Sequence, residues 1–209
     1  MRDAVAEHAP SITYLINKSI TDATVPALWK VARVTPLYKA EDKLLVENYR
    51  PISVLPVLSQ VLERVIHTQM SAYLDHLGWL YKHQYGFRRG RSTAQSVGQL
   101  NNSVLDAMDG RKVAGMLFLD ISKTFDSTNH KILLGKLEHI GLAARSLTWF
   151  KSYLADRRQC VCINGEISET RPIDLGVPQG SILGPLLFNV YINSLSAAEK
   201  LLKIGRAHV

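Results

Sequence analysis

A carboxylate closes an apolar run near the middle of the chain. Residues 113–119 read VAGMLFL, which has the length and content of a buried strand, and Asp120 follows at once. Because a buried charge is costly, this aspartate is either solvated at a sheet edge or held there to bind a cation. Hard carboxylate oxygens on a rigid strand suit Mg²⁺, whereas a solvated strand-end aspartate needs no ligand. Asp126 and Ser127 are more typical of a helix N-cap than of a metal site.

A second segment combines glycine, proline and an amide side chain. Residues 176–185 read GVPQGSILGP, with three glycines and two prolines directly before a predicted helix. Glycine allows a ligand or another stretch of chain to approach the backbone closely. Gln179 adds an amide that can both donate and accept hydrogen bonds. This segment is therefore either a ligand-binding loop or a rigid turn with nothing bound.

Arginines crowd a third segment, residues 85–93, which read YGFRRGRST. Arg88, Arg89 and Arg91 lie beside two glycines and just before a helix N-cap at Ser92 or Thr93. Guanidinium groups next to free backbone N–H groups bind phosphates well. A cluster of charges is usually a solvated face, but glycines and aromatic residues interleaved with arginines favour nucleic acid.

Basic residues also flank a loop nearer the N-terminus, within residues 36–53 (PLYKAEDKLLVENYRPIS). Lys39 precedes the loop, and Arg50 follows it, directly before a proline that favours extended backbone. Arg50 is thereby held off the start of the next predicted helix. It is either available to a ligand or paired with Glu47 on the surface.

The composition is that of a globular protein with a basic balance. The chain has 209 residues, 46% hydrophobic and 21% charged, with a net charge of +7, which favours a polyanionic partner such as nucleic acid. Cys160 and Cys162 alternate on one predicted strand and share a face, so a disulfide between them is disfavoured. No apolar run reaches the roughly 18 residues that span a bilayer.

Helical and alternating patterns follow one another along the chain. We predict helices over residues 11–29, 53–77, 129–140, 143–155 and 182–195, and one more that runs from the arginine segment to Met108. Besides the run at 113–119, strands are predicted over residues 31–40 and in a hairpin in which residues 158–163 turn at Asn164-Gly165. These elements make a mixed α/β chain.

Four segments together, in this order and spacing, resemble the reverse transcriptases of non-LTR (LINE-type) retrotransposons. They are NYRPIS, QYGFRRGRST, LDISKTFDSTNH and GVPQGSILGPLLFNVYIN, and the resemblance runs from about Ser11 to Leu195. It implies a partial right-hand polymerase that copies an RNA template from a DNA primer with deoxynucleoside triphosphates, inside the cell, in the nucleus or the cytoplasm. The regions implied are an N-terminal helical extension (1–30), a fingers-like region (31–110) and a partial palm (111–203).

The resemblance also assigns a role to each candidate residue. Asp120 matches the palm carboxylate that binds both catalytic Mg²⁺ ions, and Phe125 matches the residue that lies under the incoming sugar and excludes a 2′-hydroxyl. The other matches are Gln179 and Gly180 at the nucleotide and template, Lys39 and Arg50 at the triphosphate, and Arg88, Arg89 and Arg91 at the template or nucleotide backbone.

One part of the family pattern is not found in the sequence. Family members carry an aromatic-x-Asp-Asp hairpin after the GVPQGS helix, and no Asp-Asp pair occurs in this chain. Because two Mg²⁺ ions need carboxylates from separate elements, we expect these 209 residues alone to be inactive as a polymerase. Residues 204–209, IGRAHV, resemble a translated sequencing adapter and are left out of the fold prediction. The alternative is a nucleic-acid-binding remnant or domesticated module without catalysis.

Overall fold

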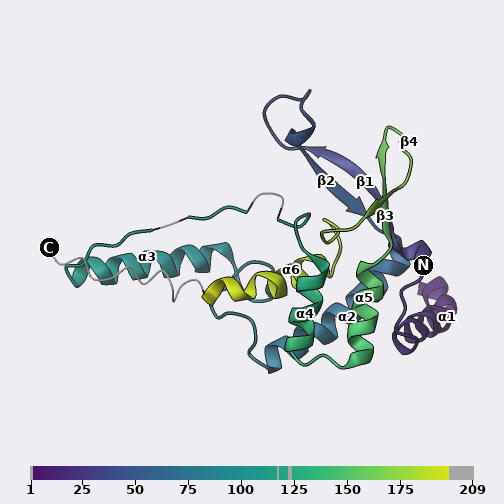
Figure 1. Ribbon diagram of the computed structural model, residues 1–209, viewed down its shortest axis with the longest axis horizontal. Coiled ribbons are helices and arrows are strands. Elements are labelled where there is room, and N and C mark those ends of the chain that lie inside the picture. The colour runs from purple at the N-terminus through teal and green to yellow at the C-terminus, as the bar shows by residue number, and fades with distance from the viewer. Residues whose placement is uncertain (1, 117, 122–123, 198–209) are drawn as a thin grey trace.

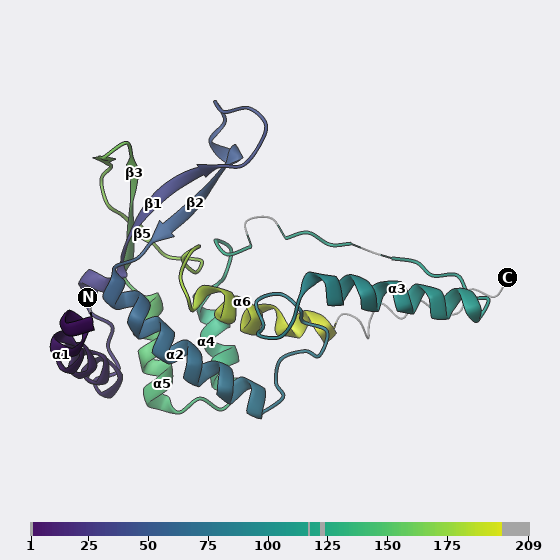
Figure 2. The ribbon, with the colours of Figure 1, turned by 180° about the vertical axis from the view of Figure 1, so that it is seen from behind.

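The computed structural model describes residues 2–116, 118–121 and 124–197. A body of packed helices carries a sheet that projects from one side, and one long helix extends away in another direction (Figure 1). The view from behind shows the same arrangement (Figure 2). The mixed α/β class predicted from the sequence is confirmed.

The sheet is mixed and has the strand order β2-β1-β3-β4, with β5 also paired to β3. Its strands are β1 (Val31–Tyr38), β2 (Tyr49–Val54), β3 (Arg157–Ile163), β4 (Glu166–Ile167) and β5 (Arg171–Ile173). β1 pairs antiparallel with β2 and parallel with β3. The hairpin predicted at Asn164-Gly165 is confirmed: both residues have positive φ, 53° and 90°, as a tight two-residue turn requires.

The sequence prediction missed β2 and started the next helix too early. Residues 53–54 belong to β2, and helix α2 runs over Val57–His76 instead of from Ser53. Pro51 faces Pro36 across the two strands, on the outer strand of the sheet, where a missing N–H is tolerated. Pro56 then restricts the backbone before it and sets the helix boundary. Arg50 consequently lies on a strand.

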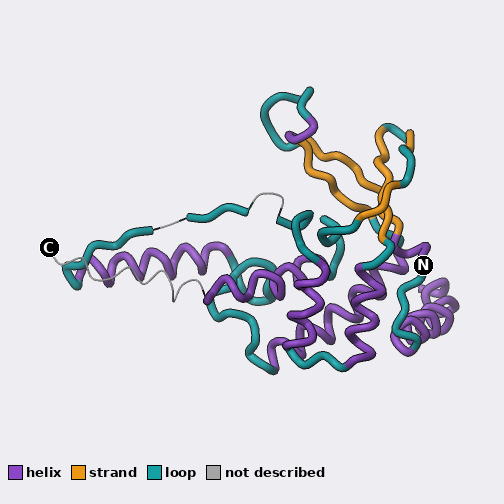
Figure 3. The backbone as a smooth tube through the Cα atoms, viewed as in Figure 1, coloured by secondary structure: helices purple, strands orange, loops and turns teal. Residues whose placement is uncertain are grey.

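The remaining helices form the body and the extension (Figure 3). They are α1 (Arg2–Thr21), α3 (Thr93–Asp109), α4 (His130–His139), α5 (Ala144–Leu154) and α6 (Gly184–Ile192), with short 3-10 turns at Ala27–Lys30, Val46–Asn48 and Asn193–Ala197. Helices α1, α2, α4, α5 and α6 share one apolar core, whose fully buried side chains include Leu62, Leu74, Leu133, Leu137, Tyr153, Leu154, Leu187 and Val190. None of the described helices is long and apolar enough to cross a membrane.

The predicted buried strand at 113–119 is wrong for its described residues. They form no strand. The side chains of Val113, Phe118 and Leu119 are 97%, 78% and 79% exposed. A strand needs a neighbour to complete its hydrogen-bond ladder, and none of the described strands pairs with this run. Asp120 is therefore an exposed residue of an extended segment and does not end a core strand.

The caps of two helices can be compared with prediction. Ser92 caps α3 in a capping box: its hydroxyl accepts from the Gln95 N–H, and the Gln95 side chain accepts from the Ser92 N–H. The N-cap of α4 was predicted at Asp126 or Ser127, but it is Asn129, whose side chain accepts from the N–H groups of Lys131 and Ile132, at 3.0 and 3.2 Å. Asparagine caps as well as aspartate or serine, so composition alone could not choose among neighbours.

Candidate functional site

The glycine-rich segment is tied to two distant parts of the chain. The Gly176 N–H donates to the Thr128 carbonyl at 2.8 Å, and the Val177 N–H donates to the Phe125 carbonyl at 2.9 Å. On its other side, the Gln179 carbonyl accepts from the Ser53 N–H at 2.7 Å. The loop therefore bridges the end of β2 and the turn that precedes α4.

Glycine is required at both of these junctions. Gly176 has a φ of +85°, and a Cβ there would lie 2.8 Å from the Asp126 Cα and the Phe125 carbonyl oxygen. Gly180 has a φ of +113°, and its Cβ would lie 2.6 Å from the Ser53 carbonyl oxygen. Both positions thus need the left-handed backbone and the missing side chain. The close approach predicted from the sequence is made by the chain's own backbone.

Phe125 and Gln179 meet at one cavity. A cavity of about 310 Å³ is lined by Phe87, Thr124, Phe125, Asp126 and Gln179. The Phe125 ring is half-buried, with ring centroids 5.7 Å from Phe87 and 5.3 Å from Phe188. Aromatic contacts on two sides hold the ring in place as one wall of the cavity. The structure therefore brings together two of the residues predicted for the nucleotide, and adds Phe87, which sequence reasoning missed.

A buried carboxylate that sequence reasoning missed holds the other end of the loop. Glu63 of α2 is only 1% exposed. Its Oε2 accepts from the N–H groups of Ile182 and Leu183, at 2.7 and 3.2 Å, and its Oε1 accepts from the Tyr153 hydroxyl at 3.0 Å. Burial raises the pKa of Glu63, and the hydrogen bonds from the two amides oppose that rise. Nothing in the sequence separates this glutamate from a solvated one, because its partners lie 90 to 120 residues away.

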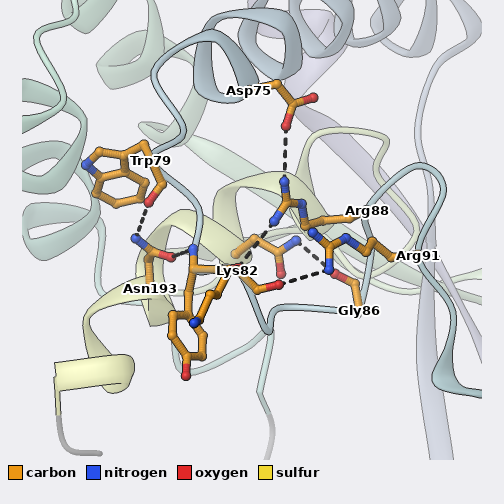
Figure 4. A network of polar contacts seen from close by, with 9 residues as sticks. Asp75, Trp79, Lys82, Gly86, Arg88, Arg91 and Asn193 are labelled. Atoms are coloured by element: carbon orange, nitrogen blue, oxygen red, sulfur yellow. Dashed lines mark hydrogen bonds and ion pairs between the residues drawn. The ribbon is translucent and has the colours of Figure 1, made fainter. Parts of the chain in front are cut away.

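The arginine segment divides into structural and free side chains (Figure 4). Arg88 is paired with Asp75 at 3.2 Å and donates to the Tyr81 carbonyl at 3.3 Å. Arg91 donates to the Lys82 carbonyl at 2.9 Å and lies over the Tyr85 ring. Two of the three predicted phosphate ligands therefore hold their own loop together.

Arg89 differs from its two neighbours. It is exposed, and no hydrogen bond or ion pair engages it within the described part of the chain. It lies two residues from Phe87, which contacts Phe125. Among the three arginines, Arg89 is thus the one whose side chain is exposed and not engaged by another described residue.

Two asparagines, one in α6 and one in the turn after it, hold residues 79–86, the loop that leads from α2 into the arginine segment, against the body. Asn189 is 1% exposed; its amide donates to the Gly86 carbonyl at 3.0 Å and accepts from Gln84 at 3.1 Å. Asn193 donates to the Trp79 carbonyl at 2.9 Å and accepts from the Tyr81 N–H at 2.7 Å. Residues four apart on a helix point the same way, which explains how one helix can secure two points of the loop.

The remaining predicted residues are not brought to this cavity. Lys39 and Arg50 are exposed near the outer end of the β1–β2 ribbon, and neither lines the cavity. No ion pair joins Arg50 to Glu47 among the residues described, so the surface salt bridge considered from the sequence is not formed.

A metal centre is not assembled by the residues that the structure describes. Asp120 is exposed, and no group of three His, Cys, Asp or Glu side chains in the described ranges could hold a metal ion. One carboxylate cannot fix two like-charged ions close together. The described residues therefore do not by themselves fit the two-Mg²⁺ site that the sequence resemblance implies.

Comparison with known proteins adds a family to this geometry. The family model described as reverse transcriptase (RNA-dependent DNA polymerase) matches residues 38–202. A protein of Drosophila melanogaster described as a probable RNA-directed DNA polymerase from transposon BS is 36% identical over 171 residues, which are 81% of this chain and 19% of that protein. The RNA-directed DNA polymerase from mobile element jockey, of the same species, is 34% identical over 183 residues, 87% of this chain and 20% of that protein.

The chain spans about one fifth of the length of these curated relatives. Among solved structures, a chain of a partial Cas6-RT-Cas1–Cas2 complex aligns with 96% of this chain and 33% of its own length, at 20% identity and a TM-score of 0.46. The family match covers all four segments that carry the sequence resemblance. The chain belongs to the reverse transcriptase family, of the LINE-type retrotransposon kind.

Proposed function

We propose that this chain is the part of an RNA-directed DNA polymerase that holds the template and receives the incoming deoxynucleotide. The observation that carries the proposal is the meeting of Phe125 and Gln179 on one cavity, beside a loop that backbone hydrogen bonds fix at both ends. Such a cavity is small, walled by aromatic rings and supplied with one amide, as nucleotide sites commonly are.

Phe125 is proposed to select the sugar. Its ring is supported by Phe188 and Phe87, so it cannot move aside easily when a bulkier ligand enters. A wall of this kind rejects an additional hydroxyl by steric contact and leaves a deoxyribose unaffected. Gln179, half-exposed at the same cavity, is proposed to hydrogen-bond the nucleotide or the template base next to it.

Exposed basic residues are proposed to bind the polyanionic ligands. Arg89 is proposed to meet the template or nucleotide backbone. Lys39 and Arg50, exposed near the outer end of the β1–β2 ribbon, are proposed to meet the triphosphate. The division into an N-terminal helical extension, a fingers-like region and a partial palm is part of this proposal.

Catalysis is proposed to require more than the described residues provide. Polymerases of this family generally use divalent metal ions, which stabilise the charge that develops at the transferred phosphate. Asp120 could contribute one ligand to such ions. We expect no primer extension from these 209 residues, but we expect binding of template–primer and nucleotide.

Binding of the two sugar types tests the proposal. With an RNA template and DNA primer in Mg²⁺ buffer, equilibrium dialysis should show at least about tenfold tighter binding of the complementary deoxynucleoside triphosphate than of its ribonucleotide counterpart. Phe125→Val should reduce this preference to about twofold. Phe118→Val, at an exposed phenylalanine outside the cavity, is the matched control and should keep it. Equal binding of both nucleotides by the unaltered chain would contradict a polymerase site and favour a module that binds only nucleic acid.

Two neighbouring arginines should give opposite results. Arg88→Ala should lower the free energy of unfolding by about 1–2 kcal/mol, because its guanidinium donates to the Tyr81 carbonyl at a partly buried position and pairs with Asp75 at the surface. Arg89→Ala should change stability by less than about 0.5 kcal/mol, yet weaken RNA–DNA binding and lower the salt dependence of log K by about one. Urea melts and fluorescence anisotropy at several salt concentrations measure both. An equal loss of stability in both variants would contradict a structural role for Arg88 and a ligand-binding role for Arg89.

A further inference from the structure

The start of helix α6 is stabilised by a side chain from a different helix. Leu183, at the N-cap position, contributes no side-chain hydrogen bond. The Ser181 hydroxyl accepts from the Gly184 N–H at 2.9 Å, and Glu63 accepts from the N–H groups of Ile182 and Leu183. A carboxylate at a helix N-terminus satisfies donors that have no partner in the helix and interacts favourably with its dipole.

This carboxylate is fixed on all sides by neighbouring groups. The Tyr153 hydroxyl donates to Oε1, and Tyr153 itself stacks on Trp149 in the core. Arg157, 1% exposed, lies over the Tyr153 ring at 4.8 Å and donates to the Tyr153 carbonyl, and its charge favours the ionised form of Glu63. Glu63 therefore has one position available, set by the core.

The backbone that Glu63 holds is close in sequence to the candidate site. Only two residues separate Ile182, held by Glu63, from Gln179, whose carbonyl accepts from Ser53. Between them, Gly180 is packed against the Ser53 carbonyl, and the Ser181 N–H donates to the Pro178 carbonyl. A loop hydrogen-bonded at both ends and packed between them leaves Gln179 little freedom to move.

We propose that Glu63 is a positioning residue for nucleotide binding: its two acceptor bonds to the Ile182 and Leu183 amides set where Gln179 lies in the cavity beside Phe125. The inference rests on the proposed function, since it assigns Gln179 to the nucleotide. This positioning depends on the length of the Glu63 side chain and on the place of its acceptor oxygen more than on its charge.

Two conservative substitutions separate reach from charge. Glu63→Asp keeps the charge but is one methylene too short to reach both amides and Tyr153. Glu63→Gln loses the charge, but its carbonyl oxygen can accept from both amides while its NH₂ group donates to the Tyr153 hydroxyl oxygen. We therefore expect Glu63→Gln to bind the deoxynucleotide within about threefold of the unaltered chain, and Glu63→Asp to bind it at least about tenfold more weakly.

Two further readouts distinguish positioning from general loss of structure. Affinity for RNA–DNA without nucleotide should stay within about twofold in both variants, because the arginine segment is held by α6 and α2 contacts that Glu63 does not make. Amide hydrogen exchange at Ile182, Leu183 and Ser53 should accelerate in Glu63→Asp and not in Glu63→Gln.

The outcomes that overturn the inference are equally definite. Slow exchange and full nucleotide binding in Glu63→Asp would do so, as would a tenfold loss of binding in Glu63→Gln. If Glu63→Asp does not fold, Glu63→Gln still decides by that second criterion. If the unaltered chain binds no nucleotide, the proposed function fails, while the exchange rates still show whether Glu63 fixes the loop.

Discussion

Replacing Gly176 with alanine should lower the free energy of unfolding by about 3–5 kcal/mol. The left-handed backbone at this residue accounts for about 1–2 kcal/mol of that loss, because an L-residue with a side chain is strained there. The rest arises from three backbone atoms of Phe125 and Asp126, which a Cβ would meet at 2.8–2.9 Å. Backbone atoms cannot move aside as the end of a flexible side chain can.

The chain contains a matched control for the share of the stability loss that arises from backbone strain. Gly165 has a φ of +90°, against +85° at Gly176, and a Cβ there would meet nothing within 4 Å. Gly165→Ala should therefore destabilise by about 1–2 kcal/mol, from backbone strain alone. Urea unfolding of both variants measures the difference. Equal losses would mean that the loop shifts freely and that the close approach to Phe125 is not needed.

The functional consequence follows from the same contacts. Gly176 and Val177 hold the carbonyls of Thr128 and Phe125, so a displaced loop moves Gln179 and the Phe125 backbone apart. Gly176→Ala should lose its preference between deoxynucleotide and ribonucleotide even under conditions in which it remains folded. Gly165→Ala, at the far end of the β3–β4 hairpin, should keep that preference.

Local signals predicted the elements that depend on local chemistry. Asn164-Gly165 has the turn residues that a tight hairpin demands, and Ser92 with Gln95 forms the capping box that starts α3. Gly141, with a φ of +92°, separates α4 from α5 and lies in the gap between the helices predicted over 129–140 and 143–155. In each case the residues that determine the structure lie within a few positions of one another.

The predictions were wrong where the local structure depends on contacts with a distant part of the chain. Residues 113–119 have the composition of a core strand, but a strand also needs a neighbour, which the sequence of the run cannot supply. β2 was missed because its short run contains Pro51 and forms a strand only by pairing with β1. Asp120 was predicted at the end of a strand for the same reason, and that placement is wrong because the strand is not formed.

The sequence predicted those site residues that can be identified from the type of side chain and its motif alone. Phe125 and Gln179, far apart in sequence, line one cavity; the family resemblance assigns both to the incoming nucleotide, and those roles stay a prediction. Arg88, Arg89 and Arg91 were grouped by charge, yet only their contacts show that two of them are structural. Glu63 and Asn189 could not be found, because a buried polar residue is recognised by partners that lie 100 or more positions away.

Asn189→Asp, a change of one amide nitrogen to oxygen, should lower the free energy of unfolding by about 3 kcal/mol at neutral pH. The Asn189 amide donates to the Gly86 carbonyl from a site that is 1% exposed. A carboxylate there would be buried and would face that carbonyl oxygen with no proton between them. Asn193→Asp makes the same change at a half-exposed position that also holds a backbone carbonyl, and it should cost only about 1 kcal/mol because water screens the charge.

The pH dependence of Asn189→Asp identifies the cause. Burial and the facing carbonyl raise the pKa of the introduced carboxyl above its ordinary value of about 3.9, so the folded state binds a proton that the unfolded state releases. Stability relative to the unaltered chain must then fall as pH rises from about 4 through the raised pKa, and recover on acidification, when the protonated carboxyl can donate to Gly86. Urea melts between pH 4 and pH 8 test this sign. Because Gly86 precedes Phe87 and Arg89 by one and three residues, RNA–DNA affinity should follow the same pH profile in this variant. A pH-independent loss would instead mean that α6 and the arginine segment are joined by packing and not by this hydrogen bond.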